Sequence, residues 1–220
     1  MKRIAVAVMA LALLAACGGS GGGGTPTTTA TKAAAEAAIE ATISAGGEAV
    51  LAALNPGNGA QVVKEAFPID NTPVSCDGSG TYTPSGTVNA NCVEGATSIT
   101  CTITDAPVQV VFNDCAKTVT IEGTTYNEVL NGTASTNVTG TITGSEATGA
   151  TINGSGTLSG TVTLTGDAAG TADLDAVTWT ATGSIEPSPT IGCDGTAVVT
   201  IDGQVAENCE VASDCKGCEQ

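Results

Sequence analysis

The sequence has no histidine and is poor in aromatic and basic side chains. Its 220 residues contain two Phe, two Tyr, one Trp and six Lys plus Arg. Without an imidazole, Ser-His-Asp, Cys-His and HExxH chemistry are excluded. The aromatic residues are too few and too scattered to build a stacking platform for sugars. Twenty-two acidic residues give a net charge of −16, so we expect no nucleic-acid partner.

What the sequence has in abundance is Thr, Gly and small apolar residues. It contains 36 Thr, 29 Gly and 41% hydrophobic residues, against only 13% charged ones. This composition is that of a chain that folds rather than one that stays disordered. The length allows one domain of ordinary size with an extension.

The first sixteen residues have the three parts of a secretory signal peptide. Lys2 and Arg3 precede an apolar run, residues 4–14, and small residues then lead to Cys17. The run is too short to span a bilayer. We therefore assign residues 1–16 to an export signal.

The end of this segment, Leu14-Ala15-Ala16-Cys17, resembles the lipobox of bacterial lipoproteins. The resemblance covers residues 1–17 only. It implies cleavage before Cys17, attachment of diacylglycerol to the cysteine sulfur, and a membrane partner reached through that lipid. Gly18, in the place where Asp would retain such proteins at the inner membrane, implies the outer membrane. The mature chain would keep four basic and 22 acidic residues, a formal charge of −18.

A tether and a helix are expected next. Residues 17–31 are rich in Gly and Thr and predict a flexible tether after the lipidated cysteine. Residues 32–54 carry apolar or small positions at helical spacing, and Asn55-Pro56-Gly57 ends the pattern. We expect a packing helix whose polar face carries Glu36, Glu40 and Glu48, and whose buried stripe is formed by Ile39, Ile43, Gly46, Val50 and Leu54.

From residue 67 to 210 the periodicity is twofold. In residues 157–165, Leu158, Gly160, Val162 and Leu164 alternate with Thr and Ser, which predicts a half-buried strand with a threonine face. Weaker alternation places Ile99, Cys101, Ile103, Val119, Ile121 and Trp179 inward. Turn signals occur at residues 83–86, 131–132, 153–154, 166–167 and 202–203. No intervening segment is long enough for a crossover helix, so neighbouring strands should be antiparallel.

The predicted fold is mainly β: a curved antiparallel meander of about nine to eleven strands packed on one N-terminal, Ala-rich helix, in a single domain spanning residues 32–220. The alternatives are a β-sandwich and an irregular β-solenoid, the latter because Gly-Thr pairs recur without a constant period. The order of elements is similar to the half-barrel-with-helix architecture of periplasmic lipoprotein carriers, without a shared motif.

Eight cysteines remain after Cys17, and an even number in an exported chain predicts a disulfide framework. Their spacing about two turns favours Cys76–Cys92 with Cys101–Cys115; the rival scheme is Cys92–Cys101 with Cys76–Cys115. The other four would pair among themselves and tie the tail, residues 209–220, to the final hairpin: Cys193, Cys209, Cys215 and Cys218.

Three further motifs are interpreted as structural. Cys215-Lys216-Gly217-Cys218 is a CxxC, but no zinc-ligand partner or redox context accompanies it. Asp167, Asp173 and Asp175 offer oxygen ligands for calcium without the spacing of a calcium loop. Sequons at Asn131, Asn137 and Asn153 follow from the composition and from turn chemistry. We predict no catalytic residue, metal site or cofactor.

Three functions compete on this basis. The first is a non-catalytic cell-envelope lipoprotein that acts as a structural or interaction module. The second is a carrier that holds a lipid or another apolar ligand in the concave face of the sheet. The third is an enzyme that uses two carboxylates alone. An apolar pocket of several hundred cubic ångströms between helix and sheet would favour the carrier.

Overall fold

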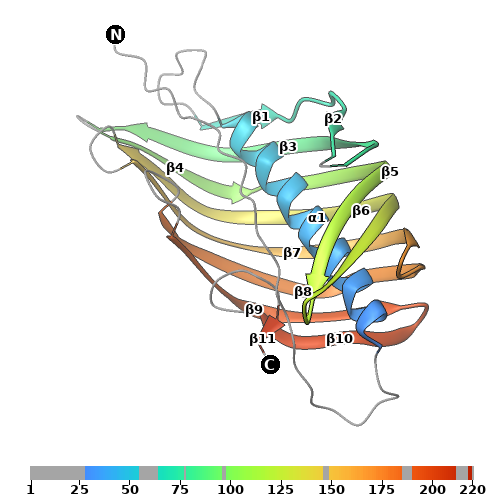
Figure 1. Ribbon diagram of the computed structural model, residues 1–220. Helices are drawn as coiled ribbons and strands as arrows, with labels where there is room; N and C mark the ends of the chain where they lie inside the picture. The colour runs from blue at the N-terminus through green and yellow to red at the C-terminus, as the bar shows by residue number, and fades with distance from the viewer. Residues whose placement is uncertain are drawn as a thin grey trace.

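The computed structural model describes residues 28–54, 64–76, 78–95, 98–145, 149–184, 190–211 and 218–219. One helix precedes a set of strands (Figure 1). The elements are α1 (Thr29–Ala53), β1 (Lys64–Pro68), β2 (Val74–Ser75), β3 (Thr81–Glu94), β4 (Ser98–Asp105), β5 (Pro107–Ile121), β6 (Thr124–Ser145), β7 (Gly149–Gly166), β8 (Gly170–Ser184), β9 (Thr190–Ile201), β10 (Gln204–Val211) and β11 (Cys218–Glu219).

All these strands belong to one antiparallel sheet of eleven strands. In two places, two consecutive short strands together occupy one strand position of the sheet. β4 and β5 both lie between β3 and β6; β4 pairs with one half of each of these strands and β5 with the other half. β1 and β2 share one side of β3 in the same way. The sheet is therefore a simple meander in which each strand position pairs with the next one along the chain, as the sequence predicts. It is not a sandwich or a solenoid.

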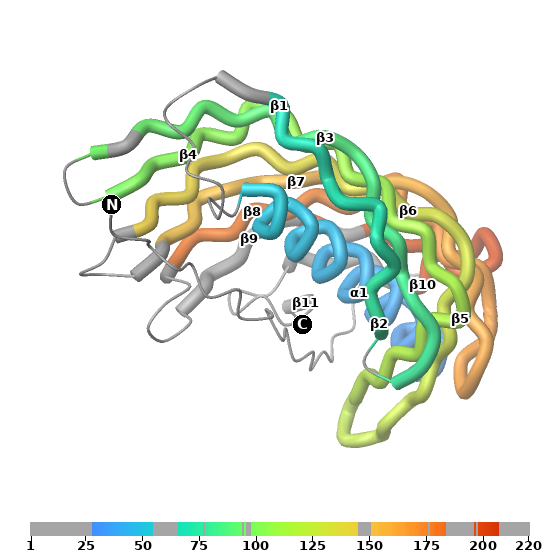
Figure 2. Tube along the Cα trace, turned by 90° about the horizontal axis from the view of Figure 1, so that it is seen from above, coloured from blue at the N-terminus to red at the C-terminus, as the bar shows by residue number. Residues whose placement is uncertain are grey.

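The sheet curves around the helix, which lies on its concave side (Figure 2). The predicted alternation is confirmed in β7, where Leu158, Val162 and Leu164 are buried and the intervening Thr and Ser residues are exposed. Val119, Ile121 and Trp179 are buried as well. The apolar side chains of the inner face form one core cluster with the helix.

Three of the expected turns are instead strand interiors. Residues 83–86, 131–132 and 153–154 lie within β3, β6 and β7. Gly132 and Gly160 have φ values of 122° and 106°, and a Cβ at either position would press on the backbone of the neighbouring strand. These glycines permit close strand approach in a bent sheet rather than chain reversal. The turns at 166–167 and 202–203 are confirmed.

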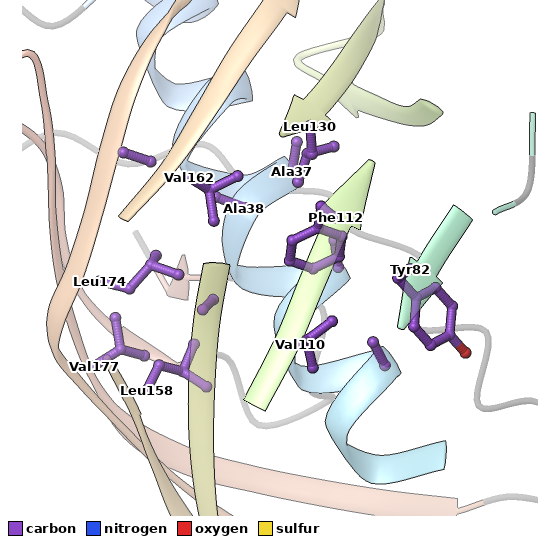
Figure 3. Packing of buried hydrophobic residues seen from close by; sticks show 14 of the residues in the cluster. Ala37, Ala38, Tyr82, Val110, Phe112, Leu130, Leu158, Val162, Leu174 and Val177 are labelled. Carbon is purple, nitrogen blue, oxygen red and sulfur yellow. The ribbon is translucent and has the colours of Figure 1, made fainter. Parts of the chain in front are cut away.

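The helix begins three residues earlier than expected. Thr28 caps it, because its hydroxyl accepts a hydrogen bond from the Thr31 N–H at 3.1 Å. Its buried face also differs from the predicted stripe, since Ile39, Ile43 and Leu54 are only partly buried. Alanines face the sheet instead, and Ala37 and Ala38 lie against Leu130 and Val162 in Figure 3. Small side chains let the helix axis approach the concave sheet closely.

The helix approaches the sheet very closely at Gly46. A Cβ at this position would overlap the methyl group of Thr136, a residue of β6 that is 2% exposed. At the adjacent Gly47, a Cβ would meet nothing within 4 Å. Of the two neighbouring glycines, only Gly46 is required by packing.

Candidate functional site

A cleft lies between the second half of α1 and the sheet, with a volume of about 90 Å³. Strands β2, β3 and β5 form its other walls. Its polar lining includes Ser44 and Glu48 of the helix, Tyr82 of β3 and Lys117 of β5. We call it the helix–sheet cleft. It brings together a carboxylate, a phenol and an ammonium group that are far apart in the sequence.

Both charged groups that line the cleft, Glu48 and Lys117, have a polar partner across the helix–sheet boundary. The Tyr82 hydroxyl donates a hydrogen bond to the Glu48 carboxylate, and Lys117 forms an ion pair with Glu40 at 2.9 Å. Glu40 and Lys117 are only 12% and 15% exposed, so this pair is better shielded from solvent than a surface ion pair. Both contacts join the helix to the sheet.

These contacts correct the expected polar face of the helix. Glu36 is 1% exposed, and Glu40 and Glu48 bind partners on the sheet. Helical periodicity identified the apolar side from Ile and Val, whereas alanines and glutamates face the sheet. The signal that could have revealed this is the dense run of Ala between residues 33 and 49, since Ala is the side chain that close packing demands.

The helix occupies the concave face of the sheet in the part of the chain that the structure describes. Alanines of α1 contact the inner side chains of the sheet, and the helix–sheet cleft has a polar rim and a volume of only about 90 Å³. A pocket that encloses an organic ligand usually has about 300 to 1,000 Å³. The helix–sheet cleft is thus too small for an acyl chain.

A second hollow, of about 320 Å³, lies on β6, β7 and β8. It is lined by Asn137 and Thr139 of β6, Ser155, Gly156 and Thr157 of β7, and Thr178, Trp179 and Thr180 of β8. No charged residue belongs to this lining. We call it the outer hollow, because its polar side chains occupy the face of the sheet opposite to the buried Val138.

Two disulfides join the four cysteines between residues 76 and 115, but in the rival scheme. Cys76 pairs with Cys115, and Cys92 pairs with Cys101. The favoured pairing was wrong because residues 83–86 are not a turn: β3 runs straight through them and places Cys92 opposite Cys101. The Cys76–Cys115 bridge ties the short strand β2 to β5 beside the helix–sheet cleft.

The remaining cysteines have a different status. Cys17, the predicted lipid-attachment residue, and Cys215, the first cysteine of the CxxC motif, lie outside the described residues. Cys193, Cys209 and Cys218 lie in β9, β10 and β11. β11 pairs with the end of β10, which places the backbone of the C-terminal segment against the final hairpin.

Each of the three aspartates considered for calcium accepts a hydrogen bond from a backbone N–H, at a β-bulge or at a turn of the sheet. Asp175 accepts a hydrogen bond from the Gly160 N–H at 2.8 Å, and Asp173 accepts one from the Asp175 N–H at 3.1 Å. Asp167 accepts from the Asn127 N–H at 2.8 Å, at the other side of the β7–β8 turn. Among the described residues, no group of three or more His, Cys, Asp or Glu is placed to hold a metal ion.

The three sequon asparagines all lie within strands. Asn131 exchanges two hydrogen bonds with Asp114, and Asn137 accepts one from the Ala106 N–H at the junction of β4 and β5. Asn153 is exposed on β7. Asn131 and Asn137 thus satisfy backbone groups where the ladder is interrupted, which gives them a structural role.

Sequence reasoning missed Glu128, a buried carboxyl group whose pKa is raised. It lies in β6, 1% exposed, and its Oε1 accepts a hydrogen bond from the Ala168 N–H at 2.9 Å. Burial raises the pKa of Glu128 to about 7; the Ala168 hydrogen bond opposes this rise and the nearby Asp167 adds to it. A Glu between Asn127 and Val129 gives no sequence signal of burial beyond its place in the alternation with Leu130.

Comparison with protein-family models, curated proteins and solved structures found no match to this chain. The helix of the described region does not have the combination of length and hydropathy needed to cross a membrane.

Proposed function

We propose that this protein is a lipid-anchored, non-catalytic lipoprotein of the cell envelope that acts as a structural or interaction module at the outer membrane. Cys17 would carry the lipid, and residues 18 to 27 would hold the folded domain away from the membrane surface. The N-terminal signal and the lipobox residues support the anchor.

The observation that favours the non-catalytic module over the carrier is the close packing of the helix on the concave face among the described residues. A carrier of the half-barrel type needs a cavity between helix and sheet, whereas here Ala33–Ala38 pack against the inner face and the helix–sheet cleft measures about 90 Å³. Two ties hold the helix in this position, Glu40–Lys117 and Glu48–Tyr82. Loading an acyl chain would require the helix to leave.

The anchor is tested by metabolic labelling with radioactive palmitate in a bacterium that processes lipoproteins. We expect label on the wild-type protein and its presence in the outer-membrane fraction. The Cys17→Ser variant should lose the label and leave the membrane pellet. Label that persists in Cys17→Ser would refute the lipoprotein assignment.

The carrier alternative predicts a different result. Lipids extracted from purified Cys17→Ser protein would contain a stoichiometric acyl ligand if the domain were a carrier. We expect none, because the helix packs closely on the described part of the concave face and the helix–sheet cleft is too small for an acyl chain.

A further inference from the structure

One face of the sheet is free of charge over several adjacent strands. The outward positions of β6 from 133 to 143, of β7 from 151 to 165 and of β8 from 178 to 182 are all Thr, Ser or Asn. The chain as a whole contains 22 acidic residues. Acidic residues border this area without lying in it: in the register of the sheet, Asp173 is opposite Thr161 and Asp194 is opposite Thr180.

The outer hollow lies within this uncharged face. Its polar side chains stand in two cross-strand rows, Asn137–Thr157–Thr178 and Thr139–Ser155–Thr180. Between the rows lies Val138–Gly156–Trp179, whose side chains belong to the opposite face, so the floor of the hollow is backbone. Rows two residues apart along a strand are about 6.5 Å apart, and residues within a row are about 4.8 Å apart.

The lining has the hydrogen-bonding character of a neutral ligand site. Each hydroxyl can donate and accept, and a carboxamide does both through separate atoms. The hollow of about 320 Å³ is large enough for a small organic molecule. We propose that the outer hollow binds a neutral carbohydrate, whose hydroxyls donate to and accept from the two rows.

Other ligand classes fit the hollow less well. An anion would find no basic side chain in the lining and would approach a strongly acidic chain. The Thr139 and Ser155 hydroxyls hydrogen-bond each other at 3.1 Å, and that of Thr178 bonds Thr196 at 3.0 Å, so further bonds to a ligand would add to these. A cation would find no carboxylate in the lining, and an apolar ligand would remove water from a surface of hydroxyl groups. The scarcity of aromatic residues still excludes a stacking platform, so recognition rests on hydrogen bonds and the affinity should be modest.

Binding is followed by saturation-transfer NMR, because the indole of Trp179 lies on the opposite face of the sheet and its fluorescence would report a ligand in the hollow only indirectly. The full-length protein, solubilised in a detergent without a sugar headgroup, is titrated with cellopentaose, maltopentaose and chitopentaose. The NMR signal identifies the sugar protons that contact the protein, and its dependence on sugar concentration gives Kd. We expect saturable binding of at least one of these neutral sugars, with a Kd on the order of 1 mM.

Thr157→Val with Thr178→Val removes two hydroxyls from the hollow while keeping the shape and branching of the side chains. We expect about tenfold weaker binding, as for the loss of two neutral hydrogen bonds. Thr163→Val with Thr165→Val makes the same change on exposed positions of β7 outside the hollow and should leave Kd within about twofold.

The proposal is overturned if none of the three sugars binds up to about 10 mM, or if both double variants weaken binding equally. An unchanged thermal midpoint in the hollow variant shows that any loss of binding is local. This proposal names a ligand for the interaction module but does not depend on the lipid anchor: failure of sugar binding leaves palmitate labelling unaffected, and the reverse also holds.

Discussion

Gly46 and Gly47 provide a matched test of how the helix packs into the sheet. Both are interior positions of α1, where replacing Gly with Ala favours the helix by about 0.5 to 1 kcal/mol. At Gly47 nothing opposes this gain, because a Cβ would meet no atom within 4 Å. Gly47→Ala should therefore raise the free energy of unfolding by about 0.5 to 1 kcal/mol.

At Gly46 the same substitution drives a methyl group into the Thr136 methyl. Overpacking of a well-packed core costs about 1 to 3 kcal/mol, and the β-branched Thr136 side chain has little freedom to turn away. After the helix-propensity gain is subtracted, we expect Gly46→Ala to lower the free energy of unfolding by about 1 to 2 kcal/mol. The two adjacent Gly→Ala variants should thus have effects of opposite sign.

The measurement is urea unfolding followed by circular dichroism with the disulfides intact. Thr136→Ser deletes the methyl group in question and leaves the hydroxyl, so the Gly46→Ala/Thr136→Ser double variant should recover most of the loss. If Gly46→Ala stabilised the protein as much as Gly47→Ala does, the close approach of helix to sheet would be refuted.

Three further predictions concern the core and the disulfides. Because the folded-state pKa of Glu128 is raised to about 7, its protonated form stabilises the fold at low pH; stability is lost as pH rises from about 4.5 through 7. Relative to Glu128→Gln, the wild type should lose about 3 kcal/mol between pH 4 and pH 8 in chemical unfolding, and parallel pH profiles would contradict this assignment. Ala38→Asp, at a fully buried position, should destabilise the protein by at least about 3 kcal/mol, more than Ile43→Asp at a partly buried one; the reverse order of melting temperatures would restore the stripe expected from the sequence. Peptide mapping under non-reducing conditions should recover Cys76 linked to Cys115 and Cys92 linked to Cys101, and a peptide joining Cys76 to Cys92 would contradict the register of β3 and β4.

The elements with a strict period of two were predictable from the sequence. Leu158, Val162 and Leu164 alternate with Thr because one face of β7 packs on the core and the other faces solvent. The Asp202-Gly203 turn was predictable because both residues have positive φ, 51° and 76°, a conformation that Gly adopts readily and Asp tolerates.

The long strands were harder to recognise because glycine has two uses. Asn131-Gly132 and Asn153-Gly154 have the composition of hairpin turns, but in β6 and β7 they lie opposite the backbone of a neighbouring strand. A single sequence does not distinguish a glycine that reverses the chain from one that lets two strands approach. That ambiguity also led to the wrong disulfide pairing.

The candidate sites were the least predictable feature. The helix–sheet cleft depends on Glu48 meeting Tyr82, and the outer hollow on Asn137, Thr157 and Thr178 meeting across three strands. The first contact follows from how the helix packs on the sheet, and the second grouping from the register of the strands. Neither local propensity nor spacing along the chain contains that register when the strands are this long.

The most direct test of a lipid-anchored domain with a filled interior is intact mass spectrometry of the protein purified from outer membranes, under native and then denaturing conditions. We predict a chain that begins at Cys17 and carries a covalent lipid in both spectra, with no additional acyl ligand in the native one. An unmodified chain, or a stoichiometric apolar ligand that is lost on denaturation, would contradict the proposed function.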